Sequence, residues 1–262
     1  MALVPPVIKT PLLGQFKNIA FGFFTREGGI SQSHSGFKSL NVALHNGDIQ
    51  KDVTENRRII CNSLNLNLDH LALVVQKHSN IVHSINQAYK IPPVGDALVT
   101  SVPNLILGIQ TADCVPVLLT DPNKKIIAAA HAGWRGAVKG ILENTVQEMI
   151  KQGADLTNIY GALGPCIWQQ SYEVKDNFIN EMQRYPNAYE KRFFISTEKQ
   201  NSYLFDLSGY VTHRLIKMGI QHIDPSPFNT FSHPERFFSY RYKTLNNSPF
   251  NGCQLSVICL KS

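Results

Sequence analysis

The sequence has no long apolar run, no paired-cysteine motif and no dense block of basic residues, and each absence excludes a class of protein. A membrane-spanning helix needs about 18 or more consecutive apolar residues, and no such run occurs. The N-terminus, MALVPPVIKTPLLG, is interrupted by prolines and lacks a cationic start, unlike a secretory signal. The five cysteines form no CxxC pair in a chain long enough to fold without disulfides, so a cytoplasmic protein is expected.

The charge balance is basic, with a formal net charge of +6 and a pI near 9.0. Such a balance favours anionic partners, but the basic residues are too dispersed for a nucleic-acid patch. A phosphate-bearing small molecule is therefore the expected partner, with neither nucleic acid nor membrane, and a scatter of solvated charge is the alternative. We expect a monomer or a weak homodimer.

The most informative stretch is TADCVPVLLTDPNKKIIAAAHAGWRG, residues 111–136, which predicts two apolar strands joined by a tight turn. A four-residue turn from Asp121 to Lys124 would fold the strands back antiparallel and place Cys114 opposite His131. Opposed side chains lie about 4.5–5.5 Å apart at Cβ, close enough to share one metal ion. Because Pro122 cannot adopt positive φ, a bulge that shifts this register by a residue is an alternative.

A third candidate ligand follows another apolar run, LALVVQKH at 71–78, which predicts a buried strand ending in Gln76 and His78. Imidazole and thiolate suit Zn²⁺, and catalytic zinc sites combine three protein ligands with an open position. His78, Cys114 and His131 make such a set, although each alone is more typical of a core or surface residue. Asp96, before a short predicted strand, could orient a metal-bound histidine or simply cap a turn.

Several short motifs occur in an order that carries a family resemblance. They are Thr25-Arg26 with Gly28-Gly29, Ser39-Leu40-Asn41 with Gly47-Asp48, Gln76 with His78, TADCVPV at 111–117, HAGWRG at 131–136, Gly164-Pro165, Tyr172-Glu173-Val174 and FFSYR at 237–241. This combination resembles the YfiH family, long labelled polyphenol oxidase or laccase domain, over about residues 21–260. The TADC and HAGWRG pair is the most specific part.

The resemblance implies a fold, a metal site and an activity. The fold would be an α+β (α/β sandwich) of mixed β-sheets flanked by helices, in a single catalytic domain, residues 1–262, with 1–18 as an N-terminal extension. The metal, zinc or alternatively copper, would be held by His78, Cys114 and His131. The activity would be phosphorolysis of purine nucleosides, with adenosine deamination as a side activity.

A phosphate site is expected beside the metal. Apolar residues at helical spacing from Val138 to Ile150 predict a helix of about five turns, ending at Gly153. Arg135 in its first turn, together with approachable backbone N–H groups at Gly133, would bind an anion. The alternative is that Arg135 pairs with a carboxylate. Asp113 is a further candidate, either for ligand binding or for the turn alone.

Other substrate-facing residues are expected in loops. Residues 25–48 lack periodicity, which predicts an active-site loop or lid carrying Arg26 and Asn41. Gln76 and Arg241 complete the candidate substrate and phosphate ligands. The chain departs from the family at Cys253 and Tyr242, where relatives carry arginines, so substrate affinity or specificity can differ here.

Two rival activities use the same residues. Cys114 as a nucleophile with His131 as its base would make a thiol hydrolase or amidase, such as a peptidoglycan-precursor editing enzyme. A copper-dependent polyphenol oxidase would need several copper centres, yet the nine histidines include no His-X-His pair. Phosphorolysis instead needs positioning and charge neutralisation, which Arg26, Arg135 and a metal could provide.

Overall fold

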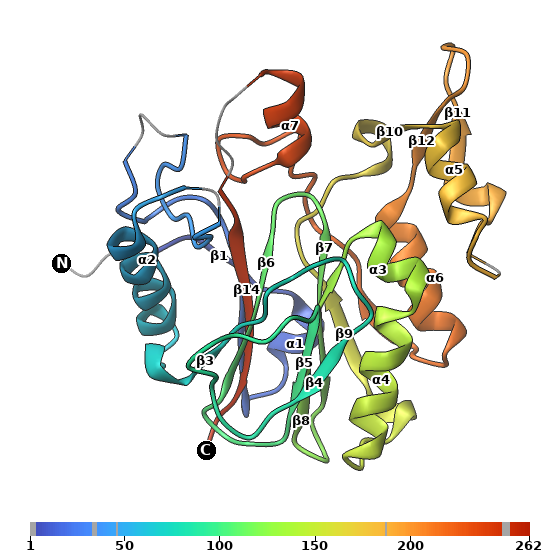
Figure 1. Ribbon diagram of the computed structural model, residues 1–262. Helices are drawn as coiled ribbons and strands as arrows, with labels where there is room; N and C mark the ends of the chain where they lie inside the picture. Colours follow the sequence, from blue (N-terminus) through green and yellow to red (C-terminus); the bar gives the residue numbers. More distant parts are fainter. Residues whose placement is uncertain (1–3, 33–35, 46, 187, 248–251) are drawn as a thin grey trace.

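The computed structural model describes residues 4–32, 36–45, 47–186, 188–247 and 252–262. Two β-sheets face each other in the middle of the molecule, with α2 outside one sheet and α3, α4 and α6 outside the other (Figure 1). This layered arrangement confirms the predicted sandwich of mixed sheets and helices. Within the described residues, no helix is long and apolar enough to cross a membrane.

The larger sheet carries most of the candidate site. Its order is β13-β9-β7-β8-β5-β4, with parallel pairs at both edges and antiparallel pairs between them. Its strands are β4 (Val82–Ser84), β5 (Ala97–Thr100), β7 (Val115–Asp121), β8 (Ile126–Ala132), β9 (Tyr160–Leu163) and β13 (His222–Asp224). The central β7 and β8 are buried along their whole length, as expected of apolar runs covered on both faces.

The second sheet has the order β1-β2-β14-β6-β3 and is antiparallel except for its last pair. Its strands are β1 (Val7–Ile8), β2 (Ile19–Phe24), β3 (Leu71–Ala72), β6 (Ile106–Thr111) and β14 (Gln254–Leu260). The segment predicted as an N-terminal extension supplies β1 and the short helix α1 (Pro11–Gly14), whose Leu13 is buried. These residues are therefore part of the sheet and its core.

Three apolar clusters fill the spaces between layers. Phe23, Leu107 and Ile258 meet Leu118 and Ile127 between the two sheets. Outside the larger sheet pack α3 (Trp134–Lys139), α4 (Ile141–Lys151) and α6 (Leu207–Lys217), and outside the smaller sheet packs α2 (Gln50–Ser63). Burial on both faces explains why these strands read as continuous apolar runs rather than alternating ones.

A small outlying unit follows β9. It comprises β10 (Glu173–Lys175), α5 (Asp176–Met182), β11 (Phe194–Ser196) and β12 (Ser202–Phe205), the strands being paired in the order β10-β12-β11. The remaining helix, α7 (Tyr240–Leu245), projects at the top of Figure 1. Both α5 and α7 bring charged side chains toward the candidate site.

The predicted hairpin is present, but the predicted register differs from the observed one by two residues. Asp121 pairs with Ile126 rather than Lys124, so Pro116, not Cys114, lies opposite His131. The Asp121 carboxylate accepts hydrogen bonds from the N–H groups of Asn123 and Lys124, which closes a longer loop that ends in positive φ at Lys125. A shift by two keeps every side chain on its face, so Cys114 and His131 still share one face of the sheet.

Two further predicted elements are wrong. The strand predicted for residues 71–78 ends after Ala72, and His78 lies in a loop with positive φ. The predicted five-turn helix is two helices, because Gly140 adopts a left-handed conformation, φ 94°, between α3 and α4. The predicted stop at Gly153, φ 103°, is correct.

The segment 25–48 has no helix or strand among its described residues, as predicted. However, Leu40, Val42 and Ala43 are buried in the cluster under α2, so this segment packs as part of the core rather than as a free lid. Its backbone is held by the Asn56 side chain, which donates to the carbonyl groups of Ser39 and Asn41.

Candidate active site

His78, Cys114 and His131 converge as predicted. Their ligand atoms all lie within 4.8 Å of one another, and no other group of this kind occurs among the residues that the structure describes. The Cys114 Sγ is 3.6 Å from His78 Nε2, and the two imidazole rings are 4.8 Å apart at their centroids. His131 is buried within β8, whereas His78 is at least partly exposed. The three side chains therefore form a compact ligand set with one accessible side.

Local backbone geometry brings these ligands together. Cys114 lies just before β7, after Asp113 turns the chain from β6 with a φ of 92°. His78 also has positive φ, which is uncommon for a side chain larger than glycine and marks a position fixed by its surroundings. Only His131 is supplied by a regular strand.

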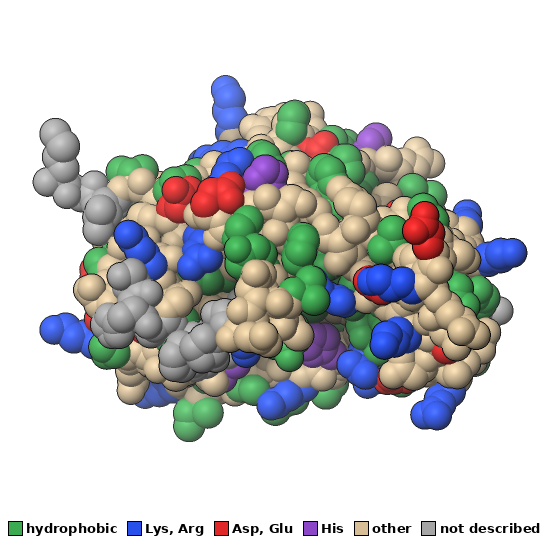
Figure 2. Space-filling model, turned by 90° about the horizontal axis from the view of Figure 1, so that it is seen from above, with side chains coloured by type: hydrophobic (Ala, Val, Ile, Leu, Met, Phe, Trp, Pro, Cys, Tyr) green, Lys and Arg blue, Asp and Glu red, His purple; other side chains and the backbone are tan. Residues whose placement is uncertain are grey.

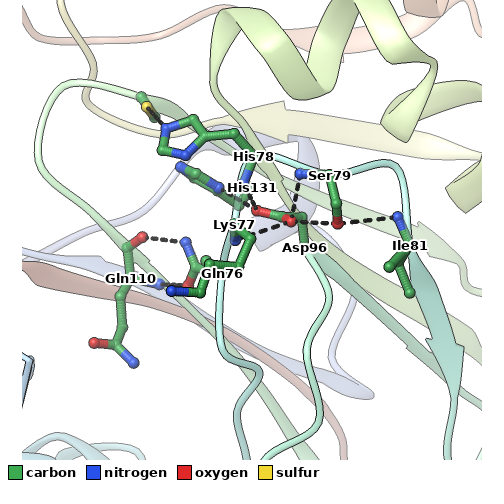
Figure 3. A network of polar contacts seen from close by, with 9 residues as sticks. Gln76, Lys77, His78, Ser79, Ile81, Asp96, Gln110 and His131 are labelled. Carbon is green, nitrogen blue, oxygen red and sulfur yellow. Dashed lines mark hydrogen bonds and ion pairs between the residues drawn. The ribbon is translucent and has the colours of Figure 1, made fainter.

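Asp96 is the hydrogen-bond centre that connects two of the ligands (Figure 3). Its buried carboxylate accepts hydrogen bonds from the backbone N–H groups of Lys77, His78 and Ser79 and from the Ser79 hydroxyl. It also lies 2.8 Å from His131 Nδ1, which leaves His131 Nε2 for a metal. Asp96 therefore fills both predicted roles, orienting a histidine and holding a turn.

The electrostatics favour the ligating form of the thiol. Burial alone would raise the pKa of Cys114, but the charges and hydrogen bonds of His131 and His78 lower it to about 6. Burial would lower the pKa of His131, but Cys114 and the carboxylate of Asp96 raise it. A thiolate is the form that binds metal ions, so the site presents the appropriate donor.

Gly133 shows how tightly the ligands are packed. A Cβ at this position would lie 2.4 Å from His78 Cδ2 and 3.0 Å from Cys114 Sγ. Only glycine leaves the ligand atoms undisturbed here. Two imidazoles, a thiolate and a supporting carboxylate are a donor set that fits Zn²⁺, and the same set can accept copper.

A cavity of about 280 Å³ adjoins Trp134, the residue that follows Gly133. Its wall is aromatic and its rim carries both charges; the lining residues are Trp134, Arg135, Tyr172, Glu173, Val174, Lys175, Asn177, Phe178, Glu181 and Arg241. The charge of Cys114 is, after burial, the largest influence that raises the pKa of Tyr172, which places this cavity within electrostatic reach of the ligand set.

Figure 2 shows the molecule from above, the side on which the β6–β7 connection and α7 lie in Figure 1. Lys and Arg side chains, with some Asp and Glu among them, lie around a central group of hydrophobic side chains on this face, and a histidine is visible beside that group. The basic groups on this face favour an anionic ligand.

Arg135 lies at the rim of the cavity, but its guanidinium is paired. Its Nε and Nη2 each donate to a different oxygen of Glu181, both at 2.9 Å, and its Cζ lies 4.4 Å from the Trp134 ring centroid. The alternative that Arg135 binds a carboxylate is thus what the structure shows. Helix α3 has only six residues, so the long helix whose first turn would support an anion is absent.

Arg241 and Asp113 are joined through the backbone. The buried carboxylate of Asp113 accepts hydrogen bonds of 2.6 Å from the Thr230 hydroxyl and from the Arg241 N–H. Asp113 therefore anchors the start of α7 instead of facing the cavity. The Arg241 guanidinium donates to the Glu173 carbonyl and lies 5.4 Å from the Tyr172 ring.

Three predicted substrate ligands have structural partners instead. Arg26 donates to the carbonyl groups of Gly36, Lys38 and Pro234. Asn41 is fully buried, and its amide contacts Ala43, Asp48 and Cys253, so the prediction that it faces substrate is wrong. Gln76 forms two hydrogen bonds with the backbone of Gln110. The polar side chains of these residues therefore stabilise the backbone around them.

Sequence reasoning missed three contributors to the site. Ser79, next to His78, supports Asp96, and Thr230 supports Asp113. Glu181, the partner of Arg135, lies 46 residues away in the chain and carries no sequence signal. Cys166, which follows Gly164-Pro165, is buried apart from the ligand cluster, and burial raises its pKa to about 12.

Several known proteins are similar to this chain over most of its length. A purine nucleoside phosphorylase of Rickettsia prowazekii (strain Madrid E) is 37% identical over 191 residues, 73% of this chain and 78% of the relative. A second, from Bacillus subtilis (strain 168), is 31% identical over 86% of this chain and 84% of the relative. An adenosine deaminase from an unknown prokaryotic organism is 32% identical over 62% of this chain and 65% of the relative.

Solved structures match over nearly the whole chain. The Bacillus licheniformis protein YfiH has a TM-score of 0.87 at 29% identity and covers 98% of this chain and 97% of its own. A Neisseria meningitidis protein of the DUF152 family has a TM-score of 0.84 and the same identity, over 99% of this chain and all of its own. With residues 20–261 matching the family model described as multi-copper polyphenol oxidoreductase laccase, the chain belongs to that YfiH-type family.

Proposed function

We propose that this protein is a metal-dependent purine nucleoside phosphorylase, converting adenosine, inosine or methylthioadenosine and phosphate to the free base and a ribose 1-phosphate, with adenosine deamination as a side activity. The names of the relatives support this proposal. The observation that carries it is the compact set of His78, Cys114 and His131 beside an aromatic cavity with arginines at its rim.

His78, Cys114 and His131 would hold Zn²⁺, with copper as the alternative metal. When bound, the ion would supply a Lewis acid. Asp96 keeps His131 in the orientation that presents Nε2, and the same carboxylate holds the His78 loop. The protein's contribution here is a fixed ligand geometry.

The cavity residues provide binding and positioning. The rings of Trp134, Tyr172 and Phe178 offer an apolar wall against which a purine can stack. Arg135 and Arg241 neutralise phosphate and hold it near the sugar, since guanidinium groups bind phosphate oxygens through paired hydrogen bonds. Holding the two reactants together in one cavity is itself a large part of such catalysis.

Polyphenol oxidation by a multicopper mechanism is less well supported, despite the family's description. That chemistry needs several copper centres, whereas the described part of the chain contains a single three-ligand group. A lone His₂Cys site fits one metal ion.

The second candidate is a thiol hydrolase or amidase. Cys114, His131 and Asp96 follow one another as nucleophile, base and orienting carboxylate, the arrangement that activates a catalytic cysteine. The two candidates differ in their need for metal: a thiol enzyme stays active in chelator, whereas the proposed phosphorylase becomes inactive and recovers when Zn²⁺ is returned.

The test is purification under metal control, followed by assays of adenosine, inosine and methylthioadenosine with and without phosphate. We expect base release that depends on phosphate and metal in the wild type and is lost in Cys114→Ala and His131→Ala. Equal turnover in wild type and variants would show that a contaminant is responsible. We further propose one catalytic domain over residues 1–262, a cytoplasmic location, and a monomer or weak homodimer.

A further inference from the structure

We propose that the Glu181 carboxylate occupies the anion position of Arg135 until phosphate displaces it. This inference rests on the proposed phosphorylase function and adds to it a residue with no role in any of the sequence motifs. The feature that points to it is a carboxylate from α5 bound through both oxygens to the arginine that follows Trp134 at the rim of the cavity.

The contact has the geometry that a bound phosphate would have. Arginine donates through a planar fork, and carboxylate and phosphate oxygens are spaced to accept both bonds at once. Glu181 accepts both hydrogen bonds of such a pair, one oxygen from Nε and the other from Nη2 of Arg135. A phosphate cannot make the same paired contact with Nε and Nη2 while Glu181 remains in place.

The pair is also placed so that it can open. The side chains of Arg135 and Glu181 are 48% and 34% exposed, so both remain hydrated when they separate. Glu181 would not lose all its partners, since its pKa is lowered not only by hydrogen bonding to Arg135 but also by the charges of Arg184 and Lys139. Arg135 would keep its contact with the Trp134 ring.

The other two arginines predicted to bind substrate differ in this respect. Arg26 uses three donors on backbone carbonyl groups, and Arg241 donates to the Glu173 carbonyl. A backbone carbonyl is fixed by the fold, whereas the Glu181 carboxylate is at the end of a flexible side chain. Among these three arginines, Arg135 is therefore the one at which phosphate can replace the present partner, the Glu181 carboxylate.

The experiment measures binding of inorganic phosphate by calorimetry to the full-length metal-loaded protein and to Glu181→Gln, Arg135→Ala and the double variant. Because exposed ion pairs are weak, we expect Glu181→Gln to tighten phosphate binding about twofold to fivefold. In the Arg135→Ala background the same change should have no effect, since no fork remains to be released.

Asp176→Asn is the matched control. It removes one negative charge from the same helix, but its carboxylate interacts with Tyr203 and does not line the cavity. Equal tightening by Asp176→Asn, or tightening by Glu181→Gln without Arg135, would indicate a general field effect and overturn the proposal. If wild type and Glu181→Gln bind phosphate equally, the role of Glu181 fails alone. If no variant binds phosphate, the phosphorylase function fails with it.

Discussion

The metal-ligand cluster and the arginine rim of the cavity are neighbours, yet they are built in opposite ways. His131 and Asp96 are buried, and the Asp96 carboxylate has five hydrogen-bonding partners within the protein. Arg135 and Glu181 are exposed and hold each other through a single ion pair. The first region has one arrangement, whereas the second can exchange one partner for another.

The difference follows from the cost of burying charge. A buried carboxylate must be fully hydrogen-bonded, so its partners become fixed along with it. An exposed ion pair gains little over hydrated separate ions and can be replaced by a ligand. Substitutions in the two regions should therefore differ in size and in what they affect.

The largest effect is expected from Cys114→Ala. Loss of a residue that hydrogen-bonds a metal ligand already lowers metal affinity or activity about 10- to 100-fold. Loss of the thiolate ligand itself should therefore lower kcat/KM more than about a hundredfold. Metal content and turnover of inosine measure this. The control for the loss of a thiol is Cys61→Ala, which changes a buried cysteine on α2. This variant should retain its metal. Full metal content in Cys114→Ala would contradict the ligand assignment.

Asp96→Asn should reduce metal affinity about 10- to 100-fold, since an amide has one acceptor oxygen for a network that uses two. Competition with a chelator of known affinity measures the change. The control is Asp69→Asn at an exposed aspartate, which should bind metal like the wild type. Unchanged metal affinity in Asp96→Asn would mean that the carboxylate serves only the turn.

Gly133→Ala tests the tight packing of the ligand cluster. The added methyl group would overlap His78 Cδ2, so we expect a loss of about 1–3 kcal/mol in stability of the metal-bound protein. Gly14→Ala is the matched change where no atom lies within 4 Å of the new Cβ, and it should stay within about 0.5 kcal/mol of wild type. Thermal denaturation with metal bound compares the two, and equal values would refute the overlap.

Arg135→Lys addresses the exchangeable region and should have the smallest effect. Lysine keeps the charge but lacks the planar fork, so the KM for phosphate should rise about fivefold to tenfold while metal affinity is unchanged. Arg58→Lys, at an exposed ion pair on α2, should leave this KM unaltered. A change in metal content would show that the two regions are not independent.

The same contrast explains which sequence-based predictions were correct. The prediction that His78, Cys114 and His131 lie close together was correct, although the predicted hairpin register was wrong and the strand before His78 is shorter than predicted. A shift of the hairpin by two residues leaves its side chains on the same face. The prediction that Asn41 faces substrate was wrong, and the sequence did not indicate the partners that Arg26 and Arg135 have within the protein. A polar residue in a loop can face a ligand or hydrogen-bond to the loop itself. The sequence does not distinguish these two cases.

Residue types alone indicated the apolar strands and the three candidate metal ligands, because burial and ligand chemistry depend on residue type and local order, whereas the sandwich was expected from the family resemblance. The roles of Asp96, Asp113 and Glu181 could be assigned only from the folded structure. Each of these carboxylates acts through partners on other elements, and its role depends on which donors the fold brings within hydrogen-bonding distance. Contacts between segments 35 to 128 residues apart, such as Asp96 with His131 and Asp113 with Arg241, leave no periodic pattern in the chain.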